Sequence, residues 1–528
     1  MRDLQQPGRS AVRAMDGLVA TSHPLSSLAA IDMLRSGGNA MDAAVCAAAV
    51  QAVVEPQSTG IGGDCFVLFA PSGNDKVIGF NGSGRSPASA TLDWYLDNGF
   101  AEIPDLGAHA VTVPGAIDAW CRLLEDHGRK GIDAALAPAI RYAEEGYVIL
   151  DRVAFDWDDA VPRLRSDPTA ARIFLKSGEP LRPGDVHRQP ELAATMRTIA
   201  AKGRAGFYEG EVADDLVRRL KELGGHHTLG DFGATTGDYV EPVKTHYRGL
   251  DIHQMPPNNQ GLTALLMLNI LSGFELSKLD PNGADRLHLE IEAGRLAYHD
   301  RDAFVGDPAL VHVPVAELLA PAYAARLATS IQADRAMTHL PRVRLPGSDT
   351  VYISVVDRDR NAVSFINSTY ESFGSGVVGP KSGVVLQNRG RSFRLVRDHP
   401  NAIAPGKRPM HTIMPGMATA NGRAIMPFGV MGGSYQPVGH VHVLSNLLDF
   451  GMDPQEAIDA PRVYHNDGKV AVERSVPSAT VEGLRRLGHD VMPAVEPLGG
   501  GQLVWIDWEN GTLTGASDPR KDGCAIGY

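Results

Sequence analysis

The sequence predicts an α/β protein built as a four-layer αββα sandwich. Three observations lead to this prediction: a helical hairpin near the N-terminus, a mainly helical middle, and a strand-rich part after Pro346. A sheet with one apolar face must bury it against another layer, and helices outside two facing sheets satisfy both sheets. The strands of residues 349–528 are therefore expected to join those of the early hairpin in one core.

The N-terminal part reads as two helices followed by two strands. Residues 22–54 begin with Pro24 near a helix start, break at Gly37-Gly38, and continue as an alanine-rich run to Val54. The apolar runs CFVLFA (65–70) and KVIGFN (76–81) enclose a polar turn. This pattern predicts a buried β-hairpin.

The middle and the C-terminal part differ in their periodicity. Helical spacing of apolar residues recurs at 115–147, 190–222 and 261–304. Strands are predicted at 351–357, 362–367, 382–388 and 423–430, and a helix at 438–450 that ends at Gly451. The prolines and glycine of residues 338–348 predict an exposed loop just before the strand-rich part.

Composition excludes several classes of protein. A net charge of −12, with no basic run carrying interleaved aromatic residues, excludes nucleic acid as a partner. The sequence has no stretch approaching the roughly 20 apolar residues of a membrane span, so we expect no membrane partner. The four cysteines lack paired spacing and the N-terminus lacks an apolar leader, which predicts free thiols and a cytoplasmic location. A leader removed from the chain would leave secretion open.

We expect neither a cofactor nor a metal. The glycine-rich segments at 60–64 and 374–383 lack the spacing of a dinucleotide fingerprint or a phosphate-binding loop. His440 and His442 lie two residues apart in a predicted helix, where they do not share a face. The predicted partner is a small-molecule substrate.

Thr350 is the candidate nucleophile. A threonine hydroxyl needs a base, and a threonine at a chain start can use its own α-amine, whose reference pKa is about 7.7–8.0. Thr350 follows the predicted loop and begins a predicted core strand, so a cut between Asp349 and Thr350 would free the amine without unpairing the sheet. By propensity alone, a threonine at a strand start is far more often an ordinary β-residue.

The predicted cut divides the chain into a large fragment, residues 1–349, and a small fragment, residues 350–528. The Thr350 hydroxyl would attack the carbonyl of Asp349, shift the backbone to an ester, and let water complete the cleavage. Each fragment lacks part of the core, so the two are expected to remain a heterodimer and together to form one αββα catalytic unit. Whether heterodimers pair again stays open.

The segment DTVYISVVDRDRNAVSFINS (349–368) resembles the nucleophile segment of the gamma-glutamyltransferases, a family of N-terminal nucleophile hydrolases. Similarity extends to VTVPGAIDAW (111–120), LHLEIEAGRLAYHDRDAFVGDP (287–308) and the terminal GASDPRKDGCAIGY (515–528). The resemblance implies the fold predicted above, with Thr350 as nucleophile and new N-terminus. It also implies a second hydroxyl at Ser368, for which a plain buried serine is the alternative.

The resemblance further implies an oxyanion site at Gly432 and Gly433, which match the family's double glycine. Residues without Cβ let the backbone N–H groups approach a developing negative charge. A turn at a helix start is the competing interpretation of the same two glycines.

The chain departs from the family where the substrate binds. Ser392 and Tyr370 stand in place of the acidic side chain and the amide that hold the substrate's α-amino group in the transferases. Arg389 replaces a neutral glutamine, and His411 and Thr412 replace two serines. The pocket therefore gains a cation and loses its anchor for an ammonium group.

A second arginine lies near the expected pocket. Ser83 takes the register of the family's carboxylate-binding arginine, but Arg85 follows two residues later and can reach the same site. Either Arg85 or Arg389 could instead be a structural ion-pair member. The segment between Phe393 and Lys407 is also shorter than the lid of typical transferases, which favours a small acyl group.

These departures predict a self-processing threonine amidohydrolase that cleaves the linear amide of a small acyl group bearing a carboxylate but no α-amine. They resemble the branch of the family with oxamate amidohydrolase and glutaryl-type acylases, and oxamate, cleaved to oxalate and ammonia, is the favoured example. A glutaryl-type acylase and a gamma-glutamyltranspeptidase or glutathione hydrolase are the alternatives within the fold. A non-catalytic scaffold that is never processed is the alternative from another class.

Overall fold

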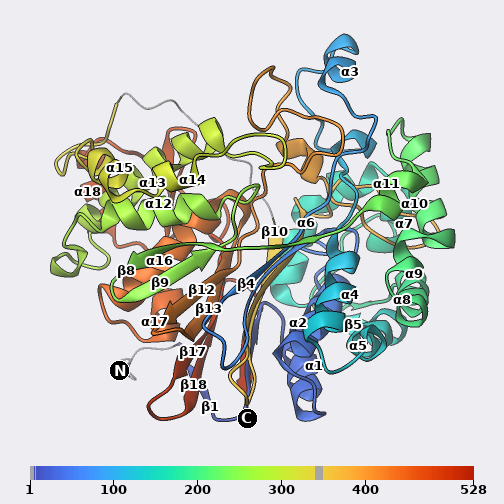
Figure 1. Ribbon diagram of the computed structural model, residues 1–528, viewed down its shortest axis with the longest axis horizontal. Helices are drawn as coiled ribbons and strands as arrows, with labels where there is room; N and C mark the ends of the chain where they lie inside the picture. The colour runs from blue at the N-terminus through green and yellow to red at the C-terminus, as the bar shows by residue number, and fades with distance from the viewer. Residues whose placement is uncertain (1–4, 6–7, 339–348) are drawn as a thin grey trace.

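The computed structural model describes residue 5 and residues 8–338 and 349–528, so most of the predicted loop at 338–348 lies outside the described residues. Two seven-stranded sheets pack face to face, and helices cover the outer face of each sheet (Figure 1). The predicted αββα architecture is confirmed.

The first sheet interleaves strands from both sides of the predicted cut. Its order is β19 (Cys524–Gly527), β2 (Leu18–Thr21), β10 (Asp349–Val356), β11 (Ala362–Tyr370), β3 (Asp64–Ala70), β4 (Ile78–Gly82) and β7 (Asp238–Val240). All neighbouring strands are antiparallel. Because β10 and β11 lie between β2 and β3, a cut before Thr350 would leave the small fragment hydrogen-bonded to the large one on both sides.

The second sheet faces the first. Its order is β1 (Val12–Ala14), β18 (Thr512–Ser517), β17 (Gly500–Asp507), β13 (Arg423–Met431), β12 (Gly416–Ala420), β9 (Leu250–Gln254) and β8 (Val243–Tyr247). The two-residue alternation of β3 shows how the layers are filled. Phe66 and Leu68 enter the core between the sheets, whereas Cys65 and Val67 pack under the helices.

Helices from the first half of the chain cover the first sheet. The predicted hairpin is α1 (Pro24–Arg35) and α2 (Ala40–Val54), and α2 begins with a capping box at Asn39 and is buried along its whole length. The predicted helical middle is confirmed by α3 (Leu92–Asp97), α4 (Ala116–His127), α5 (Ile132–Glu145), α6 (Asp151–Arg165), α7 (Pro168–Phe174), α8 (Pro190–Lys202), α9 (Ala205–Tyr208), α10 (Gly210–Glu222) and α11 (Leu229–Ala234). The short strands β5 (Tyr147–Val148) and β6 (Val186–His187) pair within this layer.

A second group of helices covers the other sheet (Figure 1). It comprises α12 (Gly261–Leu271), α13 (Ala284–Phe304), α14 (Val315–Leu318), α15 (Pro321–Ala328), α16 (Gln436–Leu448), α17 (Pro454–Asp459) and α18 (Ser478–Arg486). A small sheet of β14 (Val463–Asn466), β15 (Lys469–Val472) and β16 (Asp490–Pro493) lies beside them.

One local prediction is wrong. Residues 382–388 form a buried loop rather than a strand, because Gly383 adopts a φ of +66° and only isolated bridges, such as that of Leu386 with Gly62, pair the segment. The region 261–304, predicted to be mostly helical, consists of α12 and α13, separated by residues 272–283.

The expectation of free thiols is confirmed, since all four cysteines are unpaired. Among the helices of the described residues, none has the length and apolar character needed to cross a bilayer.

Candidate active site

Thr350 lies at an irregularity of β10. The register with β11 shifts between Asp349, which faces Tyr370, and Val351, which faces Asn367. Extra residues of this kind in a ladder re-aim side chains and are frequent beside active sites. The Thr350 side chain is buried, and its Oγ1 donates a hydrogen bond of 3.3 Å to the Oγ of Ser368.

Ser368 is held in place by its own strand and by β3. Its Oγ accepts a hydrogen bond of 2.8 Å from the backbone N–H of Tyr370. Across the sheet it is paired in register with Asp64. The two hydroxyls predicted to act together are therefore adjacent and rigidly supported.

The double glycine forms the turn between β13 and α16. Gly432 and Gly433 have φ values of +123° and +57°, and a Cβ on Gly432 would lie 2.9 Å from the Cα of Gly499, so this turn requires glycine. The Nε2 of Gln260 donates both to the carbonyl of Gly433, at 3.0 Å, and to the carbonyl of Thr412, at 2.6 Å. Gln260 thus joins the turn to the predicted substrate pocket.

Arg389 is completely buried in the 3₁₀ helix η3 (Arg389–Ser392). Its Nη1 donates a hydrogen bond of 2.8 Å to the Oγ1 of Thr412, and its guanidinium carbon lies 3.8 Å from the centroid of the Tyr370 ring. Its Nε and Nη2 have no hydrogen-bond partner within the described part of the chain, and no described carboxylate forms an ion pair with it. Burial lowers the pKa of Arg389 to about 10 although Tyr370 and Asp64 oppose the shift.

Tyr370 combines an unusual backbone with an unsatisfied hydroxyl. Its φ of +84° is rare for a bulky residue, and such strain gathers at functional sites. Its buried hydroxyl has no hydrogen-bond partner among the described residues. Burial raises the pKa of Tyr370 to about 12, so the hydroxyl keeps its proton at neutral pH and can donate it.

His411 pairs with Asp64, a residue that the sequence analysis missed. The distance from His411 Nε2 to Asp64 Oδ2 is 2.9 Å. Burial, aided by the charge of Arg389, lowers the pKa of His411 to about 3. The ring is therefore neutral, donates through Nε2, and leaves its buried Nδ1 as an acceptor without a partner in the described structure.

The carboxylate of Asp64 is fully engaged. Its Oδ1 accepts hydrogen bonds from the backbone N–H groups of Gly84 and Gly115 and from the Nε2 of Gln387, at 2.8, 3.1 and 2.9 Å. Asp64 ends the glycine-rich segment at 60–64 and begins a buried strand. This position in the sequence was the available signal for it. Asp64 links Ser368 to His411 across the floor of the site.

Arg85 is placed differently from Arg389. It is about one-third exposed, at 33%, and pairs with Asp238 at 3.5 Å and Asp307 at 3.7 Å. These contacts match the alternative in which Arg85 is a structural ion-pair member.

The two serines at positions where the family binds substrate are engaged by the protein. Ser83 donates to the Oδ1 of Asn81, and the Oγ of Ser392 lies 2.9 Å from two backbone carbonyls, those of Arg389 and Met410.

A separate cluster has the residue types of a metal site. His288, Glu292 and His489 offer ligand atoms that all lie within 4.8 Å of one another, and all three residues are buried. The sequence did not predict this cluster. The four-residue spacing of His288 and Glu292, which places both on one face of a helix, was the available signal.

The fold has two facing antiparallel sheets covered by helices. A hydroxyl residue near the start of a central strand lies beside a second hydroxyl. This is the arrangement of an N-terminal nucleophile hydrolase. The family model described as Gamma-glutamyltranspeptidase matches residues 26–528, and the chain belongs to this family.

Its relatives include several hydrolases. The Glutathione hydrolase-like YwrD proenzyme of Bacillus subtilis is 39% identical over 97% of this chain and 98% of its own length. The Oxamate amidohydrolase proenzyme of Klebsiella pneumoniae is 36% identical over the same shares, 97% and 98%. The crystal structure of cephalosporin acylase from Bacillus halodurans superposes with a TM-score of 0.93 at 41% identity, covering 100% of this chain and 99% of that one. The chain is therefore a hydrolase of amide bonds.

Proposed function

We propose that the protein is a self-processing threonine amidohydrolase for a small acyl group that carries a carboxylate and no α-amine. The observation that carries this proposal is the edge of the Arg389 guanidinium that has no hydrogen-bond partner among the described residues. Its Nε and Nη2 lie side by side on the planar guanidinium, where two parallel N–H groups match the two oxygens of a carboxylate.

Maturation begins with Thr350. Its Oγ1 attacks the carbonyl carbon of Asp349, the peptide bond is converted to an ester, and water hydrolyses the ester to give residues 1–349 and 350–528. The interleaved order of the first sheet keeps the two fragments together as a heterodimer. The cut creates the α-amine of Thr350, which then serves as the base.

Catalysis uses the same α-amine of Thr350. The amine takes the proton of the Thr350 hydroxyl, whose oxygen attacks the substrate's amide carbonyl, while Ser368 orients that hydroxyl. The N–H groups of Gly432 and Gly433 stabilise the oxyanion, and the amine or ammonia leaves with the proton returned by the base. Water then attacks the acyl ester, the acid leaves, and the threonine hydroxyl is restored.

The pocket charge favours an acyl group without an amine. Arg389 supplies the cation, Thr412 orients it, and the Tyr370 hydroxyl adds a third donor for the carboxylate. Asp64, which accepts from His411, already accepts four hydrogen bonds and so does not serve as the ammonium anchor of a gamma-glutamyl substrate. Oxamate is the favoured substrate, as in the Klebsiella relative's name.

A glutaryl amide is the second candidate. It has the same free carboxylate and also lacks an α-amine, and the similarity to a cephalosporin acylase supports it. The two candidates differ in the distance between the scissile carbonyl and the carboxylate, so acyl length distinguishes them.

A substrate panel with a cleavage assay tests the proposal. Wild-type protein is expected to resolve into two fragments whose small one begins at Thr350, and to release ammonia or amine from oxamate or a glutaryl amide faster than from a gamma-glutamyl amide. Thr350→Ala should stay a single band of 56.4 kDa without activity. A variant that still splits, a wild-type chain that never splits, or faster turnover of the gamma-glutamyl amide would each contradict the proposal.

A further inference from the structure

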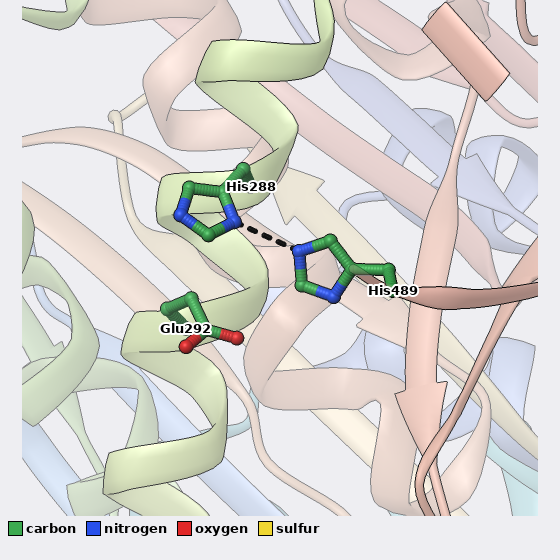
Figure 2. Close-up of side chains that lie close together, drawn as sticks. All are labelled: His288, Glu292 and His489. Carbon is green, nitrogen blue, oxygen red and sulfur yellow. Dashed lines mark hydrogen bonds between the residues drawn. The ribbon is translucent and has the colours of Figure 1, made fainter. Parts of the chain in front are cut away.

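His288, Glu292 and His489 join three segments of the chain that lie on both sides of the predicted cut. His288 and Glu292 occupy one face of α13, and His489 reaches them from the turn before β16 (Figure 2). The distance from His288 Nδ1 to His489 Nε2 is 2.8 Å. The predicted large and small fragments are therefore in direct polar contact here.

The third segment is residues 332–337, which precede the predicted cut. The carbonyl of Gln332 lies 2.7 Å from His288 Nε2, and the backbone N–H of Met337 donates to the Oε2 of Glu292 at 2.8 Å. Between these two contacts, the N–H of Ala336 donates to the carbonyl of Leu487 at 2.6 Å. The segment is thus tied both to α13 and to the small fragment.

The hydrogen bonds of this cluster are mutually consistent. A carbonyl oxygen can only accept, so the Nε2 of His288 carries a proton and donates to Gln332. The Nδ1 of His288 can then accept a hydrogen bond from the N–H of His489 Nε2. The chain of donors and acceptors runs in one direction from His489 to Gln332.

The charges of this cluster favour a hydrogen-bonded clamp over a metal centre. Arg295 donates to the Oε1 of Glu292 at 2.7 Å and neutralises its charge, and Met337 occupies the other oxygen. A divalent cation would have to displace the bond between the two histidines and sit beside the partly buried charge of Arg295.

We propose that His288, Glu292 and His489 form a clamp that positions the chain for its own cleavage. The clamp fixes residues 332–337, which precede the predicted cut in the chain, and β10 fixes Thr350, which follows it. Intramolecular attack depends on such orientation. The inference rests on the proposed cleavage between Asp349 and Thr350, and it assigns the three residues to maturation and not to turnover.

The rate of maturation tests the clamp. His489→Leu removes the donor to His288 and should slow the appearance of the two fragments about fivefold, the size expected for one lost buried hydrogen bond. His489→Gln keeps an N–H at the end of a side chain of similar reach and should restore most of the rate. The kcat and KM of each fully matured variant should equal those of the wild type, and amide exchange at Met337 should be faster in His489→Leu.

The matched control is His187→Leu, which removes a buried histidine whose Nε2 has no hydrogen-bond partner in the described structure. It should mature at the wild-type rate. The clamp is overturned if His489→Leu matures as fast as the wild type, if His187→Leu is slowed equally, or if kcat falls with the maturation rate. The purified protein could instead hold one zinc ion per chain, with chelation removing both the zinc and the capacity to mature. That result would show that the cluster is a metal site and not a clamp. A wild-type chain that never splits would instead remove the proposed function.

Discussion

The molecule contains two buried polar clusters that differ in how completely their hydrogen bonds are made. Around Arg389, the described structure leaves the Nε and Nη2 of the arginine, the hydroxyl of Tyr370 and the Nδ1 of His411 without partners. Around His288, both ring nitrogens and both oxygens of Glu292 are occupied by protein groups.

The number of buried polar groups without partners distinguishes a binding site from a structural contact. A buried donor without a partner destabilises the free protein by about 1–3 kcal/mol, and more when it is charged. A cluster that retains several such groups is suited to a ligand that completes them, whereas a saturated cluster has nothing left to bind. The difference supports the proposals that the first cluster binds the substrate and that the second arranges the chain.

The largest expected effect comes from removing the unpaired cation. Arg389→Met should lower kcat/KM for the carboxylate-bearing substrate about 10²- to 10³-fold, the range for losing one partner of a buried charge pair. Because the free enzyme no longer buries an unpaired charge, its melting temperature should rise. Steady-state kinetics and thermal unfolding measure the two effects, and a variant that is both active and less stable would contradict the comparison.

The second prediction concerns pH. Burial lowers the pKa of Arg389 only to about 10, so the guanidinium keeps its charge at neutral pH and KM for the carboxylate should stay level up to about pH 9. Arg389→Lys starts from a lower pKa, which burial lowers further. In that variant KM should rise with pH within the range where the wild type is unchanged. KM profiles at pH values where circular dichroism shows a folded protein provide the measurement.

A smaller effect is expected at the neighbouring hydroxyl. Tyr370→Phe keeps the ring beneath the guanidinium of Arg389 and removes only the unpartnered donor. KM for the substrate should rise about fivefold, as for one neutral hydrogen bond, with kcat almost unchanged. An equal fall in kcat would place the hydroxyl at the reacting carbonyl instead of at the carboxylate.

The smallest effect is expected at Arg85, which has two acidic partners and is partly exposed. Arg85→Met should change kcat/KM less than about twofold and lower the free energy of unfolding by about 0.5–1 kcal/mol, as for other partly exposed ion pairs. Denaturant unfolding and the same kinetic assay measure both. A loss of activity near that of Arg389→Met would show that the two arginines act together.

The sequence predicted the helical and strand-rich layers because the patterns that indicate helices and strands lie within short stretches of the chain. The period of apolar residues separated the helical middle from the strands that follow Pro346, and the proline and glycine positions predicted both ends of α1 and the start of α2. It failed at residues 382–388, where apolar residues suited to a strand are buried in a loop by contacts from distant segments.

The sequence by itself determined the αββα class and, through the segment at 349–368, placed Thr350 and Ser368 as neighbours on adjoining strands. Only the tertiary structure decided which arginine is unpaired, that Asp64 holds His411, and that His288 meets His489. Those facts depend on side chains far apart in the sequence, on their burial and on which donors remain unfilled. No local pattern encodes these properties, because each depends on what the rest of the chain brings to the same place.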